Sequence, residues 1–134
     1  MGPGQLAGEA VLVVEDEPLI ALDITYGLHH AGADVLAART LEDGLRLAEQ
    51  RKLSAAILDF ALSGTDVALL CDRLNERGIP FMFYSGRAPE EFTEWPDAPV
   101  VSKPAATGKI VAVLADLLMR SAPPRIVAPL RRSA

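Results

Sequence analysis

The sequence is poor in cysteine and in positive charge. Its one cysteine, Cys71, excludes an internal disulfide framework. Val67, Leu70 and Leu74 beside it predict the apolar face of a helix, so we expect a buried core residue rather than a reactive thiol. The net charge of -5 argues against non-specific binding of nucleic acid, which requires a basic surface. The expected partners are therefore proteins, not nucleic acid.

Long hydrophobic runs are also absent, although 50% of the residues are hydrophobic. No apolar stretch approaches the ~18 residues of a membrane span. The first residues, Met1–Gln5, lack the basic and apolar regions of a signal peptide. We therefore expect a cytoplasmic protein that does not interact with membranes.

The length of 134 residues allows one domain with a substantial core and is too short for two. We expect residues 1–9 to form an N-terminal extension and residues 10–120 to form the domain. Residues 121–134 combine prolines with arginines, which is typical of a disordered tail.

Short apolar runs alternate with longer segments of helical period, which is typical of a parallel sheet in an α/β fold. Strands are expected at Ala10–Val14, Ala33–Ala38, Ala55–Leu58, Pro80–Tyr84 and Pro99–Val101. Helices are expected at Pro18–Gly32, Thr40–Ala48, Asp66–Arg77 and Thr107–Arg120. Before the last strand, prolines leave room only for a short helical turn at Ala88–Thr93.

Polar residues lie within two positions after the ends of four of these strands: Glu15, Asp16, Asp59, Ser85 and Lys103. The carboxyl ends of parallel strands open on one edge of the sheet, where ligands of open α/β sheets bind. Neighbouring carboxylates repel one another there, and a bound Mg²⁺ would relieve this repulsion. The hydroxyl and the ammonium group suit an anion. The sequence therefore predicts a site for Mg²⁺ and a phosphoryl group.

Each of these residues has an expected role. Asp16 and Asp59 are the expected direct ligands of Mg²⁺, with Glu15 acting through water and the backbone carbonyl of Ala61 completing the site. Asp59 would attack a phosphorus atom, because carboxylates accept phosphoryl groups as acyl phosphates. The serine hydroxyl and the lysine would neutralise and orient the other oxygens. Taken singly, such residues also occur as helix caps and turn residues, but their conjunction in sequence order favours one site.

These motifs resemble the receiver domain of two-component response regulators over about Ala10–Arg120. The acidic pair lies in VLVVEDEP, the phosphoacceptor in Leu58-Asp59, the switch hydroxyl in Tyr84-Ser85-Gly86 and the lysine in Lys103-Pro104. The resemblance implies a flavodoxin-like (βα)₅ fold and phosphorylation of Asp59 by a histidine kinase or a histidine phosphotransfer protein. It implies no metabolic substrate, so we do not expect an enzyme. It also implies a stand-alone receiver that signals to a downstream protein by contact, by phosphate relay or as a phosphate sink.

The chain departs from the family pattern at three places. Val100 stands where many receivers carry an aromatic switch residue. The loop Phe60–Gly64 is shorter than usual and lacks its proline. Gly86–Ala98 has no pattern for a long helix. The stretch Phe81–Gly86 is similar to the Phe-Ala-Thr-Gly type of strand in single-domain receivers whose fourth helix is short or mobile.

Several alternatives stay open. Trp95 either packs the proline-containing segment down or contacts a partner. Val111 lies off the core-facing stripe of the last helix and raises a homodimer hypothesis. A phosphatase of the haloacid dehalogenase type needs Asp-x-Asp after its first strand, and the sequence there is Glu15-Asp16-Glu17. The remaining alternative is a degenerate receiver that binds a partner without being phosphorylated.

Overall fold

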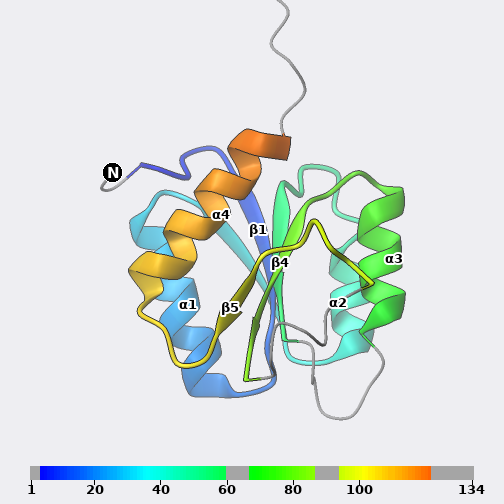
Figure 1. Cartoon of the computed structure of the whole chain (residues 1–134), viewed down its shortest axis with the longest axis horizontal. Coiled ribbons are helices and arrows are strands. Elements are labelled where there is room, and N and C mark those ends of the chain that lie inside the picture. The colour runs from blue at the N-terminus through cyan, green and yellow to red at the C-terminus, as the bar shows by residue number, and fades with distance from the viewer. Residues whose placement is uncertain (1–3, 60–66, 87–93, 122–134) are drawn as a thin grey trace, which may run out of the picture.

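Five parallel strands form one sheet in the order β2-β1-β3-β4-β5 (Figure 1). The computed structural model describes residues 4–59, 67–86 and 94–121. The strands are β1 (Ala10–Val14), β2 (Asp34–Ala38), β3 (Ala55–Leu58), β4 (Phe81–Ser85) and β5 (Val100–Ser102). The helices in the described residues are α1 (Pro18–His30), α2 (Leu41–Leu47), α3 (Ala68–Glu76) and α4 (Thr107–Ser121). The expected doubly wound α/β fold is confirmed.

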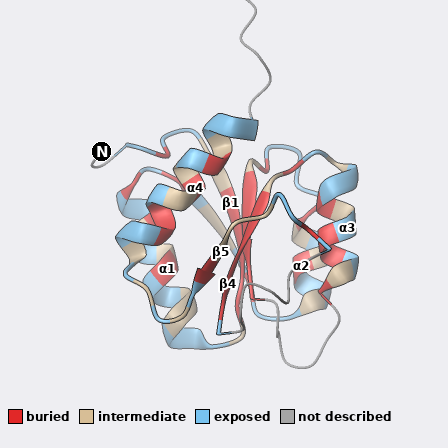
Figure 2. Ribbon diagram, viewed as in Figure 1, coloured by how far each residue is buried: buried red, intermediate tan, exposed pale blue. Residues whose placement is uncertain are grey.

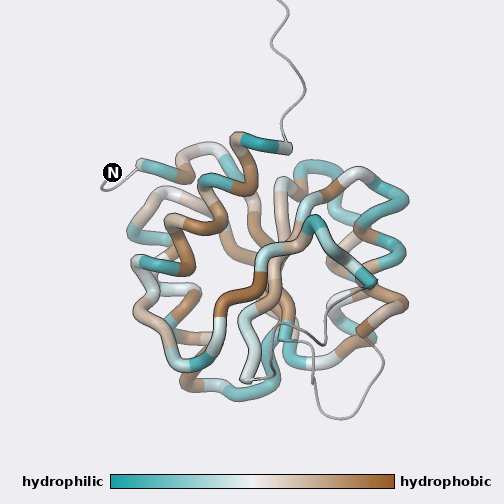
Figure 3. Tube along the Cα trace, in the orientation of Figure 1, coloured by the Kyte–Doolittle hydropathy of each residue, from teal (hydrophilic) through white to brown (hydrophobic). Residues whose placement is uncertain are grey.

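Helices cover both faces of the sheet, so the molecule has three layers and two cores. Figure 1 shows α1 and α4 against one face and α2 and α3 against the other. Successive β1 residues alternate between the two cores: Leu12 and Val14 pack toward α2 and α3, whereas Val11 and Val13 pack toward α1 and α4. The central strands are buried on both faces (Figure 2), and they are hydrophobic along their length (Figure 3). Parallel strands sandwiched in this way need apolar residues at nearly every position.

Local sequence signals explain four of the helix boundaries. Pro18 occupies the first turn of α1, where its missing N–H costs no hydrogen bond. The hydroxyl of Thr40 caps α2 by accepting a hydrogen bond from the N–H of Asp43 at 3.1 Å. Gly32 and Gly78 follow α1 and α3. Their φ values are 98° and 70°, which residues other than glycine rarely adopt.

Two prolines set the starts of the last strands one residue later than expected. The carbonyl of Pro80 accepts from the N–H of Ala56, and the carbonyl of Pro99 accepts from the N–H of Phe83. Neither proline has an N–H to donate, so β4 begins at Phe81 and β5 at Val100. At its other end β4 extends one residue further than expected, so Ser85 is its last residue.

The expected N-terminal extension packs on the domain from Gly4 onward. The N–H groups of Gly4 and Leu6 donate to the carbonyl of Ala31 at 3.0 and 2.8 Å. The side chain of Leu6 is buried in the core beneath α1 and α4. At the other end α4 continues through Ser121, and residues 122–134 lie outside the described part of the chain.

The structure decides several of the alternatives left open by the sequence. Cys71 is buried in the core as expected. Trp95 is also buried, with its ring centroid 6.0 Å from that of Phe83, so it packs its own segment down. Val111 is buried in the core between α4 and the sheet, which corrects its assignment to the outside of the helix and removes the observation that motivated the homodimer hypothesis.

The connection between β4 and β5 is described only in part. The expected helical turn at Ala88–Thr93 lies outside the described residues. Within the described stretch 94–99 there is no helix. The expectation of a short or irregular fourth helix therefore stays a prediction.

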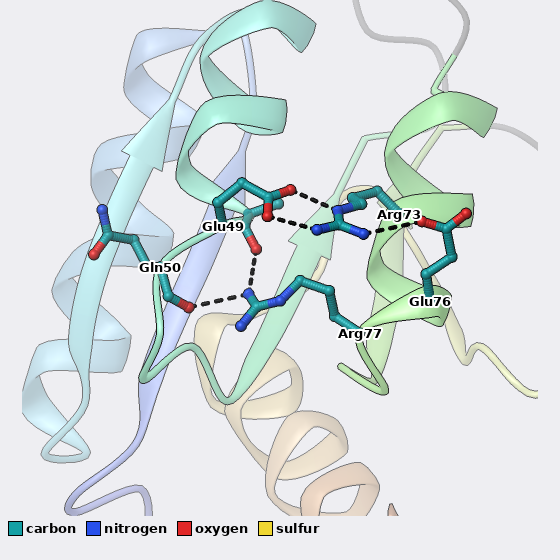
Figure 4. Close-up of polar contacts among 6 residues, drawn as sticks. Glu49, Gln50, Arg73, Glu76 and Arg77 are labelled. Carbon is teal, nitrogen blue, oxygen red and sulfur yellow. Dashed lines mark hydrogen bonds and ion pairs between the residues drawn. The ribbon is translucent and has the colours of Figure 1, made fainter.

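A polar network joins α3 to the end of α2 (Figure 4). The guanidinium of Arg73 donates to both carboxylate oxygens of Glu49, at 2.6 and 2.7 Å, and to Glu76 at 3.0 Å. Arg77 donates to the backbone carbonyls of Ala48 and Gln50. The hydrogen bond from Arg73 lowers the pKa of Glu49, and the same bond raises the pKa of Arg73.

Candidate functional site

The polar residues predicted for the site lie at the carboxyl edge of the sheet. Glu15 and Asp16 follow β1, Asp59 follows β3, Ser85 ends β4 and Lys103 follows β5. Backbone hydrogen bonds continue the ladders by one residue beyond several strand ends. These bonds run from the N–H of Glu15 to Ala38, from Asp59 to Val14 and from Lys103 to Ser85, at 3.0, 3.2 and 2.9 Å. Site residues on neighbouring strands are therefore held by the sheet itself.

Lys103 connects the site across the sheet. Its Nζ lies 3.1 Å from Oδ2 of Asp59 and 3.1 Å from Oε1 of Glu15. A third carboxylate, that of Glu17, lies 3.8 Å away and is more exposed. Glu17 was not predicted as a site residue, although its place beside the acidic pair was the available signal. The side chain of Lys103 thus brings β5 into contact with β1 and β3.

Three carboxylates meet beside this lysine. Oxygens of Glu15, Asp16 and Asp59 all lie within 4.8 Å of one another. Glu15 and Asp59 are buried, and Asp16 is half-buried. Carboxylate oxygens are the hard ligands that Mg²⁺ prefers, so the donor set fits this ion. The carbonyl of Ala61, predicted as a further ligand, lies outside the described residues.

Burial and charge act in opposite directions at this site. Burial raises the pKa of Glu15, although hydrogen bonds from Lys103 and from the N–H of Glu17 oppose this change. Burial alone would lower the pKa of Lys103, but its hydrogen bonds and ion pairs with Glu15 and Asp59 outweigh burial and raise it. Lys103 therefore carries its positive charge at neutral pH.

Two residues of β4 lie next to the lysine. Ser85 has no solvent exposure and pairs with Ser102 of β5 in the sheet register. Tyr84 precedes it, and its ring centroid lies 5.6 Å from Nζ of Lys103. Sequence reasoning treated Tyr84 as a strand residue alone, because nothing in the pattern shows what its hydroxyl contacts.

A cavity of about 310 Å³ lies elsewhere, at the amino end of β4. Phe81, the first residue of β4, lines it together with Trp95 and Leu117. Ser85 is at the opposite end of the same strand. The cavity therefore does not belong to the carboxylate site.

Comparisons with known proteins agree with this architecture. The alkaline phosphatase synthesis transcriptional regulatory protein PhoP of Bacillus subtilis (strain 168) is 34% identical over 71 residues, which make up 53% of this chain and 30% of that protein. A response regulator receiver protein from Sinorhizobium medicae WSM419 aligns over 86% of this chain and 98% of its own, with a TM-score of 0.79 and 20% identity. The chain has the fold of a response regulator receiver domain.

The receiver fold is shared with longer proteins as well. The response regulator PhyR from Brucella abortus aligns over 86% of this chain and 49% of its own, with a TM-score of 0.74 and 27% identity. The chain thus spans less than a third of PhoP and about half of PhyR. No family model matches the sequence. Among the described residues, no helix has both the length and the hydropathy needed to cross a bilayer.

Proposed function

We propose that this receiver domain accepts a phosphoryl group on Asp59 in a two-component system. The observation that carries the proposal is the ion pair of Asp59 with Lys103 at 3.1 Å, inside a cluster that also contains Glu15 and Asp16. An acyl phosphate on a buried carboxylate needs its negative charge neutralised. A neighbouring cation and a group of acids that can hold a metal ion meet this need.

The chemistry proposed for these residues is a direct displacement at phosphorus. A carboxylate oxygen of Asp59 forms the new P–O bond, and the donor leaves with the electron pair of the bond that breaks. Lys103 then neutralises phosphoryl oxygens in place of the carboxylate charge it now contacts. The Ser85 hydroxyl, at the end of the neighbouring strand, is the proposed donor to another phosphoryl oxygen.

Magnesium is the proposed cofactor, and Glu15, Asp16 and Asp59 would hold it. When bound, it would neutralise the charge that builds up on the transferring phosphoryl group. Ala61 remains the proposed source of a backbone ligand.

The proposed phosphodonor is a histidine kinase or a histidine phosphotransfer protein. The proposed output goes to another protein, by contact, by relay of the phosphoryl group or by competition for it. We place this signalling in the cytoplasm and propose no catalytic turnover on a metabolic substrate.

The decisive experiment is the intact mass of the full chain after incubation with acetyl phosphate and Mg²⁺. We expect a gain of one phosphoryl group that disappears in Asp59→Asn and with a chelator. Asp72→Asn, an exposed aspartate on α3, is the matched control and is expected to be phosphorylated as the wild type is.

Two other results would contradict the proposal. Release of many equivalents of phosphate per chain from a phosphate ester would favour a phosphatase. No phosphorylation from acetyl phosphate or from a panel of phosphorylated histidine proteins would favour a degenerate receiver that only binds a partner.

A further inference from the structure

Tyr84 contacts two functional parts of the site with one buried side chain. It is 6% exposed and belongs to the core between the sheet and the pair α1 and α4. It directly precedes Ser85 at the end of β4. Its side chain therefore lies beneath the site, on the face of the sheet that α4 covers.

The hydroxyl of Tyr84 holds the backbone of the segment that leads into α4. The N–H of Ala105 donates to Oη of Tyr84 at 2.9 Å, and Oη donates to the carbonyl of Ala105 at 3.3 Å. Both polar groups of one peptide residue are thus satisfied by one side chain. Ala105 lies two residues after Lys103 and two residues before Thr107, where α4 begins.

The ring of Tyr84 contacts Lys103 itself. Nζ of Lys103 lies 5.6 Å from the ring centroid, within the range of a cation–π interaction. The same ammonium pairs with Asp59 and Glu15. A movement of Lys103 toward a phosphoryl group would therefore change its contact with the Tyr84 ring. The hydroxyl of that ring is hydrogen-bonded to Ala105.

The backbone makes this connection short. Tyr84 and Ser85 pair with Val101 and Ser102 of β5, and the N–H of Lys103 donates to the carbonyl of Ser85 at 2.9 Å. The end of β5 and Ala105 belong to one short stretch of chain. When the end of β5 moves, Ala105 either moves with it or stays hydrogen-bonded to Tyr84. Ala105 is half-buried against the same core as α4, so its displacement reaches that helix.

We propose that Tyr84 is a positioning residue that transmits the phosphorylation state of Asp59, through Lys103 and Ala105, to the start of α4. This inference rests on the proposed phosphorylation of Asp59. The hydroxyl acts on the α4 connection, and the ring acts on Lys103. The two groups therefore have separable effects.

The test compares Tyr84→Phe, which loses only the hydroxyl, with Tyr84→Leu, which also loses the ring. Tyr26→Phe on α1 is the matched control, because Tyr26 is 73% exposed. Three quantities are measured: the rate of Asp59 phosphorylation by acetyl phosphate, the change in amide chemical shift of residues 105–110 on phosphorylation, and the urea midpoint of unfolding.

For Tyr84→Phe we expect phosphorylation within about twofold of wild type, and a chemical-shift response at residues 105–110 reduced by roughly half or more, because two hydrogen bonds to Ala105 are lost. For Tyr84→Leu we expect the phosphorylation rate to change about two- to fivefold as well, because the cation–π contact with Lys103 is removed. Tyr26→Phe should match wild type in all three measurements.

An unchanged response in Tyr84→Phe would overturn the proposal. A parallel loss of phosphorylation, response and stability in that variant would show a purely structural residue and would overturn it too. If the wild type accepts no phosphoryl group, the proposed function fails separately. The inference is then judged in the unphosphorylated protein, where Tyr84→Phe must shift the Ala105 amide signal and Tyr84→Leu must also shift the Lys103 ε-methylene signals. Unshifted signals would refute it.

Discussion

At the scale of single residues, Lys103 matters most to the candidate site. It lies between the buried carboxylates of Glu15 and Asp59 and is itself largely buried. Removing one member of a buried ion pair leaves the other charges without compensation, which costs more than the pair contributes when intact. Lys103 therefore has two separable roles, in stability and in the response to phosphorylation.

We expect Lys103→Met to lower the free energy of unfolding by about 2 kcal/mol in the absence of divalent ions, because Glu15 and Asp59 lose their cation. Addition of Mg²⁺ should recover part of this loss, since the ion can neutralise the same acids. Urea unfolding with and without Mg²⁺ measures both effects. Lys109→Met, at an exposed position of α4, serves as the control; an equal loss there would refute the explanation.

The same lysine is expected to couple phosphorylation to conformational change. Lys103→Ala should still accept some phosphoryl group on Asp59, because that carboxylate and the acids proposed to bind Mg²⁺ remain. The phosphorylated variant should not show the chemical-shift changes of phosphorylated wild type. A normal response in this variant would contradict the role assigned to Lys103.

The pKa of Glu49 gives a pH-dependent prediction. The hydrogen bond from Arg73 lowers this pKa below its ordinary value of 4.5. A carboxyl group with a lowered pKa in the folded state contributes stability above its unfolded pKa and loses it as the pH falls through the folded value. Glu49→Gln should therefore be less stable than wild type near neutral pH, and the difference should shrink below pH 4.5.

Thermal unfolding of both proteins across this pH range measures the effect. Glu94→Gln, at an exposed turn residue, is the control and should show no comparable pH-dependent difference. A difference between wild type and Glu49→Gln that is constant with pH would show that the ion pair is not its source.

At the scale of elements, the packing of α1 against α4 depends on a glycine. A Cβ built on Gly27 would lie 3.0 Å from Cβ of Thr107, closer than ordinary van der Waals contact. Thr107 is the first residue of α4, so Gly27 sets how near this end of α4 comes to α1. Close approach of two helices thus depends on the absence of one side-chain atom.

We expect Gly27→Ala to destabilise the protein by about 1 kcal/mol, because the cost of overpacking exceeds the gain in helix propensity. Gly108→Ala is the matched control, since a Cβ there meets no atom within 4 Å. That variant should be as stable as wild type or slightly more stable. Urea unfolding of both variants decides the matter, and equal effects at the two positions would contradict the packing argument.

At the scale of the whole molecule, the site joins strands from the centre of the sheet to its edge. The acids follow β1 and β3, and the lysine follows β5. A ligand that binds these residues in the folded state, and not in the unfolded chain, stabilises the entire domain. Metal binding should therefore be visible in global unfolding.

We expect Mg²⁺ at ten times its dissociation constant to raise the free energy of unfolding by about 1.4 kcal/mol. Asp16→Asn should abolish most of this gain, because one of three converging carboxylates is lost. Sodium chloride at the same ionic strength is the control for screening. A gain that persists in Asp16→Asn would place the ion elsewhere.

Much of the fold and of the site was predictable from local patterns. Alternating apolar runs and helical segments leave a parallel sheet as the arrangement that buries both faces of each strand. A parallel sheet in turn brings the carboxyl ends of its strands to one edge, so Glu15, Asp59 and Lys103 were predictable as residues of that edge once the strands were assigned. The ion pairs of Lys103 show that they meet there. The burial of Cys71 was predictable as well, since the helical period alone places it on the inner face of its helix.

Tertiary structure decided what periodicity does not contain. The pattern of α4 shows which of its faces is apolar, but how far neighbouring elements cover that face depends on how they pack, and this is why Val111 is inside. Leu6 is buried because the N-terminal segment bonds to Ala31 at the end of α1, a contact between residues far apart in sequence. The hydroxyl of Tyr84 found its partner in Ala105 in the same way. The sequence by itself determined the sheet and the edge where the polar residues gather, because these follow from local periods; contacts between distant segments needed the folded chain, because they depend on distances that no local pattern encodes.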